Sequence, residues 1–123
     1  MAGMVVTITE IAHTSVKLIK FAWTTDSGTA TATGTTTGYY TGKILGLATD
    51  PSAGGTQPDD DYDITVTDTN SLYVLMGGGA DRDETNTEYV LSTSLGSVVE
   101  SQLTINVSAA GNSNVGAAYL YIR

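Results

Sequence analysis

Residues 62–67 are Tyr62-Asp63-Ile64-Thr65-Val66-Thr67, with a branched apolar side chain at every second position from Ile64. This alternation places Ile64 and Val66 on one face of an extended chain and polar side chains on the other. It is the pattern of a β-strand with one buried face. The stretch 102–108 repeats the pattern. Two such strands predict β structure packed against a common core.

Further strands are predicted on both sides of this stretch. The chain turns at 68–71 and returns at 72–76, so 62–76 is expected to form a hairpin, and so are 102–108 and 115–123. Residues 5–9 and 38–48 also have strand character. In the long strand 15–25 the apolar side chains change faces near Leu18 and Ile19, which predicts a bulge or a bend there.

Composition favours an all-β domain. The chain has 123 residues, of which 41% are hydrophobic, and this suits one domain over 1–123. It contains 21 threonines and 14 glycines, which favour strands and turns respectively. Residues 85–98 are ambiguous between a short helix and strand. The expected fold is a small antiparallel β-sandwich or a jelly-roll-like barrel of seven to eight strands, with at most one short helix.

One segment differs from the others. Residues 27–38 consist almost entirely of threonine, glycine and alanine, without a large apolar side chain. Such a segment specifies its register weakly and is not expected to anchor itself in the core of its own chain. It is expected to be either a flat edge strand or an extended arm that lies across a neighbour.

Net charge and residue types exclude several functions. The formal charge is −8, which argues against binding to nucleic acid, where lysine and arginine supply most of the affinity. No stretch approaches 18 apolar residues, so a membrane partner is not expected. The sequence has no cysteine and one histidine, His13, which leaves no thiolate or multi-histidine metal site within one chain.

The acidic residues are concentrated in the middle of the chain. Residues 46–100 hold eleven of them against one arginine. If the two acidic loops lie at one end of the fold, that end is strongly negative. It could then be a solvated surface, a docking face or a calcium site. The alternating aspartates give weak calcium candidates, which are Asp59, Asp61, Asp63, Asp81 and Asp83.

No motif predicts catalysis or a cofactor. The glycine run 77–79 is followed by acidic residues in place of the lysine of a phosphate loop. His13 is accompanied by no nucleophile elbow. The chain is therefore expected not to be an enzyme. Its tyrosines and Trp23 could alternatively form a sugar-stacking platform, as in a carbohydrate-binding β-sandwich.

Three blocks of the sequence resemble small β-rich structural proteins of tailed bacteriophages. They are Lys17-Leu-Ile-Lys-Phe-Ala-Trp23, the stretch from Tyr62 to Glu88 that includes Gly79-Ala-Asp-Arg82, and Ala118-Tyr-Leu-Tyr-Ile-Arg123. The resemblance implies a component of the virion, assembled in the cytoplasm of a bacterial host. Capsid decoration (cement) proteins are the leading class, and neck, tail or fibre modules of the same virion are the alternative.

A decoration protein binds the outside of the capsid and stabilises it. The expected partners are the major capsid protein or other virion proteins, together with further copies of this chain in a homo-oligomer. The residues expected at such contacts are Val5, Thr31, Thr35, Tyr39, Tyr40, Asp60 and Arg82.

Overall fold

The computed structural model of the chain describes residues 4–12, 16–51, 56–84, 86–91 and 95–123. In this described part of the chain, nine β-strands form two antiparallel sheets. The same residues contain no helix and therefore no helix that could cross a membrane. The strands are β1 (Val5–Ala12), β2 (Lys17–Thr24), β3 (Ala32–Thr35), β4 (Tyr40–Asp50), β5 (Asp63–Thr67), β6 (Glu88–Leu91), β7 (Ser97–Ser101), β8 (Thr104–Ser108) and β9 (Val115–Ile122).

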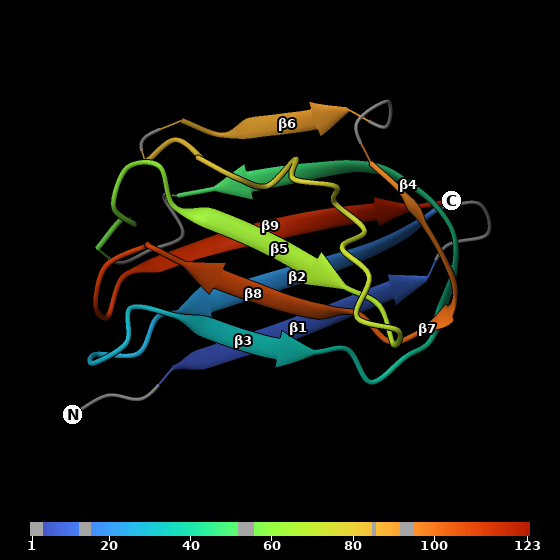
Figure 1. Ribbon diagram of the computed structural model, residues 1–123, viewed down its shortest axis with the longest axis horizontal. Helices are drawn as coiled ribbons and strands as arrows, with labels where there is room; N and C mark the ends of the chain where they lie inside the picture. The colour runs from blue at the N-terminus through green and yellow to red at the C-terminus, as the bar shows by residue number, and fades with distance from the viewer. Residues whose placement is uncertain (1–3, 13–15, 52–55, 85, 92–94) are drawn as a thin grey trace.

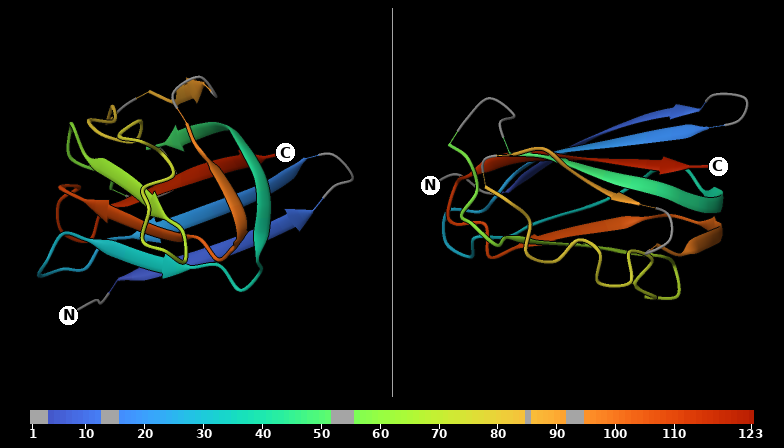
Figure 2. Two further views of the ribbon diagram at one scale, coloured as in Figure 1. Left: turned by 45° about the vertical axis from the view of Figure 1, so that its right-hand side comes forward. Right: turned by 90° about the horizontal axis from the view of Figure 1, so that it is seen from above.

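The two sheets pack face to face as a sandwich, which confirms the predicted class (Figures 1 and 2). The strand count is nine, not seven to eight. The large sheet has the order β1-β2-β9-β4-β6, with β7 also pairing with β4. The small sheet has the order β3-β8-β5. Strand β4 pairs with β9 along one edge. Along its other edge it pairs with β7 at Tyr40–Lys43 and with β6 at Gly46–Thr49.

The core lies between the sheets and follows the alternation in the sequence. On β2, Ile19, Phe21 and Trp23 point inward, and on β5 the buried residues are Ile64 and Val66, as predicted. The Trp23 and Tyr62 rings pack with their centroids 5.7 Å apart. Other buried side chains of this core are Ile44, Leu47, Leu103, Ile105, Val107, Leu120 and Ile122.

Neither predicted hairpin forms a full pair of strands. After β5 the chain does turn back, but it pairs only at one antiparallel bridge between Thr67 and Tyr73, and residues 74–79 form turns. Strands β8 and β9 belong to different sheets, so the chain crosses the sandwich between them. Alternation shows that each strand has one apolar face, but it does not show which sheet the strand joins.

The predicted bulge in the second strand is also wrong. Strand β2 pairs with β1 and β9 without a register shift, and Leu18 simply faces outward. The change of faces in the sequence arises because both faces of this strand carry apolar residues. In the ambiguous stretch 85–98, the described residues form β6 and the start of β7, and none is helical.

The threonine-rich segment is an edge strand anchored in its own chain. Strand β3 pairs with β8, and its threonines face partners there: Thr33 Oγ1 donates to Asn106 Oδ1 at 2.8 Å, and the Thr35 and Thr104 hydroxyls lie 2.9 Å apart. Ala32 and Thr36 are buried. The expectation that this segment cannot anchor in the core is therefore wrong, because small side chains suffice where the sheets approach closely.

Glu10 of β1 holds the connection between the two sheets. Its carboxylate accepts hydrogen bonds from the Thr37 and Gly38 amides at 3.1 and 3.0 Å and from the Thr37 hydroxyl at 2.9 Å. The Tyr40 hydroxyl donates a fourth, short hydrogen bond to it. Burial acts to raise the pKa of Glu10, but the hydrogen bonds, Tyr40 first, bring that pKa below its usual value. Burial and the neighbouring carboxylate together raise the pKa of Tyr40.

Candidate interaction surfaces

Three parts of the surface stand out from their surroundings. The acidic end consists of Asp59, Asp60, Asp61, Asp63, Asp81 and Asp83. The apolar rim consists of Leu72, Tyr73, Met76 and Val99. The tyrosine face consists of Leu18, Leu45, Tyr89, Tyr119 and Tyr121.

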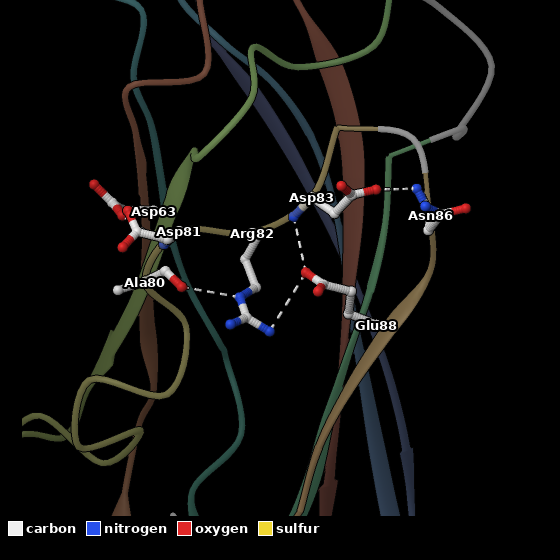
Figure 3. A network of polar contacts seen from close by, with 7 residues as sticks. All are labelled: Asp63, Ala80, Asp81, Arg82, Asp83, Asn86 and Glu88. Atoms are coloured by element: carbon white, nitrogen blue, oxygen red, sulfur yellow. Dashed lines mark hydrogen bonds and ion pairs between the residues drawn. The ribbon is translucent and has the colours of Figure 1, made fainter.

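The acidic end forms where the chain enters β5. Tyr62 and Arg82 form an isolated antiparallel bridge, and this brings the two acidic loops of the sequence together. The Asp81 amide donates to Asp63 Oδ1 at 2.9 Å (Figure 3). The pKa of Asp61 is raised, first by the charge of Asp60, then by burial and by the charges of Asp81, Asp63 and Asp83. The predicted concentration of negative charge at one end is present.

Arg82 lies inside this cluster as a structural cation. Its Nη1 lies 3.5 Å from Glu88 Oε1, and its Nε donates to the Ala80 carbonyl at 3.1 Å (Figure 3). Glu88 Oε1 also accepts from the Asp83 amide at 2.8 Å. Arg82 thus joins the loop to β6, and its guanidinium is engaged within its own chain.

The five aspartates proposed as calcium ligands do not converge on one point. Asp63 and Asp83 instead accept hydrogen bonds from the Asp81 and Asn86 amides, which fixes the loop (Figure 3). In the described part of the chain, no three acidic, histidine or cysteine side chains are grouped so that they could hold a metal ion. His13 lies outside the described residues.

The apolar rim is built by the loop 68–76 and β7. Leu72, Tyr73, Met76 and Val99 are between 62% and 74% exposed. One contact fixes the loop to β7 and a second to the residue before it: the Thr69 and Ser101 hydroxyls lie 3.2 Å apart, and the Gly96 amide donates to the Val74 carbonyl at 2.9 Å. Large apolar groups that stay exposed on a fixed loop are typical of a surface that a partner covers.

The loop of the apolar rim is stabilised by its own hydrogen bonds. Asp68 Oδ1 accepts from the Asn70 and Leu72 amides at 2.9 and 3.0 Å. The Asp68 amide donates in turn to the Leu72 carbonyl at 3.1 Å. The loop therefore presents Leu72 and Tyr73 in a defined conformation.

The tyrosine face is the outer surface of the large sheet. In β9, Leu120 and Ile122 point into the core, so Tyr119 and Tyr121 point outward. The pairing places Leu18 beside Tyr121, and Ala48 between Tyr119 and Tyr89. An open pocket of about 260 Å³ lies on this face, lined by Val16, Leu45, Gly46, Tyr89, Val90 and Tyr121.

The expected sugar platform is only partly present. Trp23 and Tyr62 lie in the core, and Tyr40 is bound to Glu10. Tyr89, Tyr119 and Tyr121 do share one face. The pocket beside them is lined by apolar and aromatic side chains, whereas a sugar site needs several polar groups aimed at the hydroxyls.

The residues expected at partner contacts do not form one surface. Val5 and Tyr39 are exposed, Thr35 is exposed at the end of β3, and Asp60 belongs to the acidic end. Thr31 is half-buried before β3. Tyr40 is nearly buried and, like Arg82, is engaged within its own chain. Tyr39 directly precedes Tyr40, which pairs with Ser101 of β7.

The sequence singled out every aspartate of the acidic end, but it did not group the residues of the apolar rim or of the tyrosine face into surfaces. A signal existed for Tyr119 and Tyr121, which alternate with Leu120 and Ile122. The sequence carries no local signal that Tyr89 joins this face, because its place beside Ala48 depends on the pairing of β6 with β4. Comparison of the chain with protein-family models, with curated proteins and with solved structures gave no match.

Proposed function

We propose that this protein is a non-enzymatic structural protein of a tailed-phage virion, a capsid decoration protein that binds the outer shell through its apolar rim. The observation that carries the proposal is the set of four large apolar side chains held exposed on a fixed loop and strand. Removal of such groups from water is favourable by about 25 cal/mol for each Å² of apolar surface, and this term opposes the entropic cost of association.

The phage assignment itself draws on the sequence blocks described above, which resemble virion proteins. A neck, tail or fibre position in the same virion is the alternative. A fixed apolar surface suits any of these positions, since all are protein–protein contacts. Binding to isolated shells separates decoration from the alternative.

The experiment is co-sedimentation with expanded, undecorated capsids of the phage or prophage whose genome carries this sequence. The wild-type chain is expected to saturate the shells at a fixed ratio to the major capsid protein and to raise their melting temperature. A Tyr73→Ser/Val99→Ser variant should bind at least tenfold more weakly, as expected when central apolar contacts are lost.

The matched control is Val5→Ser, which removes an apolar side chain that is 56% exposed at the start of β1, outside the three surfaces. It should leave shell binding unchanged. Full binding by the apolar-rim variant would show that another surface makes the contact. Absence of wild-type binding to shells would overturn decoration and leave the neck, tail or fibre.

A further inference from the structure

The tyrosine face carries positive charge around its aromatic centre. Lys20 pairs with Tyr119 across β2 and β9, and its Nζ lies 5.4 Å from the centre of the Tyr119 ring. This is a cation–π contact, in which the ring keeps the ammonium group at the face.

Two further cations border the same face. The Lys43 amide donates to the Arg123 carbonyl at 3.0 Å, and the Arg123 amide donates to the Lys43 carbonyl at 2.9 Å. Residues that exchange both backbone hydrogen bonds are direct neighbours, and their side chains lie on the same face. Arg123 follows buried Ile122, so it alternates outward with Tyr121, and both Lys43 and Arg123 are exposed. Three of the five lysines and arginines thus border one apolar surface.

The same molecule carries the complementary surface at its acidic end. Asp59, Asp60 and Asp61 are exposed there, and the Tyr62–Arg82 bridge adds Asp81 beside them. The acidic end lies where β5 begins, whereas Arg123 follows β9 at the opposite end of the sandwich (Figure 1). Lys43 and Arg123 therefore lie away from the acidic end of their own chain, so the two charged regions can contact different copies.

We propose that the tyrosine face of one copy binds the acidic end of a second copy. The contact sets Lys20, Lys43 and Arg123 against carboxylates, while Tyr89, Tyr121 and the pocket give it an apolar centre. It goes beyond shell binding, and it names surfaces for the homo-oligomer that the sequence led us to expect.

Charge also decides the symmetry of the contact. Two tyrosine faces packed against each other about a two-fold axis would bring their lysines and arginines together, and like charges in an interface weaken binding. A contact between two different surfaces avoids this repulsion. Contacts of this heterologous kind produce rings or open filaments, depending on the rotation between successive copies.

The test uses two variants, each of which damages one surface. Lys43→Glu/Arg123→Glu reverses the charge of the tyrosine face, and Asp60→Lys/Asp61→Asn removes about half of the negative charge of the acidic end. All four positions are exposed. Asn70, which is exposed on the loop of the apolar rim, provides the controls: Asn70→Glu and Asn70→Lys add charge away from both surfaces. Circular dichroism and thermal melting verify that each variant is folded.

Sedimentation velocity over a concentration series measures association. The wild-type chain and both Asn70 controls should form oligomers at low salt, with weaker association at high salt because salt screens exposed charges. Each of the two surface variants alone should associate at least tenfold more weakly. An equimolar mixture of the two should form a one-to-one pair and nothing larger, because each variant keeps one intact half of the contact.

Three results would overturn the proposal. They are a wild-type chain that stays monomeric up to millimolar concentration, an acidic-end variant that associates like the wild type, and a mixture that stays monomeric. If the acidic-end variant associates like the wild type and only the tyrosine-face variant loses association, the contact is a two-fold dimer of tyrosine faces. Shell binding is measured separately with the apolar-rim variant. A failure of self-association therefore leaves the proposed function standing, and a failure of shell binding leaves the self-association proposal standing.

Discussion

Gly116 of β9 leaves the space that the indole of Trp23 occupies. The two residues are direct partners across β9 and β2, and a Cβ added at Gly116 would lie 2.3 Å from Cζ2 of Trp23. Trp23 cannot move aside easily, because its ring is buried and packs against Tyr62. Position 116 thus requires glycine for reasons of space.

The Gly116→Ala variant should accordingly be less stable than the wild type by about 1–3 kcal/mol, the usual cost of overpacking a core. Urea unfolding followed by tryptophan fluorescence measures the loss. Gly46→Ala is the control, because a Cβ there would have its nearest neighbour, the Val90 carbonyl oxygen, at 3.4 Å. It should change stability by less than about 0.5 kcal/mol. Equal stability of the two variants would contradict the proposed steric role.

Replacement of Glu10 should weaken the link between β1 and the 36–40 connection. Glu10→Gln keeps the size of the side chain but removes the charge that four donors stabilise, so we expect a loss of about 1–3 kcal/mol at pH 7. Tyr40→Phe removes only one of these donors and should cost less.

The effect of Glu10→Gln should depend on pH. The pKa of Glu10 is lower in the folded chain than its ordinary value of 4.5. Its contribution to stability is therefore complete above that ordinary value and is lost as the pH falls through the lower folded pKa. Unfolding curves of variant and wild type should converge towards pH 2. A constant difference from pH 7 to pH 2 would show that the charge of Glu10 contributes nothing.

Asp61→Asn should stabilise the chain at neutral pH. Asp61 is repelled by Asp60 and other nearby carboxylates, which raise its pKa, and its backbone has a positive φ of 60°, a conformation that asparagine tolerates well. The repulsion acts fully above the raised folded pKa and disappears as the pH falls below the ordinary aspartate pKa. Thermal melting should therefore show a small gain at pH 7 that shrinks at pH 2–3. A lower melting temperature at pH 7 would contradict this account.

Asp68→Ala tests whether the apolar rim must be held in a fixed conformation. The substitution removes the acceptor of the Asn70 and Leu72 amides but leaves every apolar side chain of the rim in place. Shell binding should weaken by about 3- to 30-fold, because ordering a loop on binding costs free energy. Thr104→Ala, which removes a hydroxyl contact with Thr35 in the small sheet, is the control. Equal shell affinity of Asp68→Ala and wild type would show that the loop need not be fixed in advance.

Local alternation predicted the strands well where one face is polar. In β5 and β8, Ile64, Val66, Ile105 and Val107 are all buried as expected. The same rule failed in β2, because Leu18 and the neighbouring Val16 are apolar on the outer face. An apolar outer face is a property of the surface, and the sequence alone cannot distinguish it from a bulge.

The surfaces were harder to predict than the strands. The acidic loops were visible as runs of charge, but their meeting depends on the bridge between Tyr62 and Arg82. The tyrosine face combines β2, β4, β6 and β9, whose order in the sheet differs from their order in the chain. Pairing between distant strands has no local signal, so the neighbours of Tyr89 could not be derived.

The position of β9 has a consequence for how the protein folds during synthesis. This strand is the ninth in the chain, yet it lies between β2 and β4 in the large sheet. While the ribosome is still making residues 1–114, β2 and β4 have no strand between them, and their inner faces remain open. Formation of such non-local pairings is slow, and unpaired strand edges favour aggregation. The large sheet is therefore completed only when residues 115–122 have emerged, and until then the edges of β2 and β4 that β9 will occupy are unpaired.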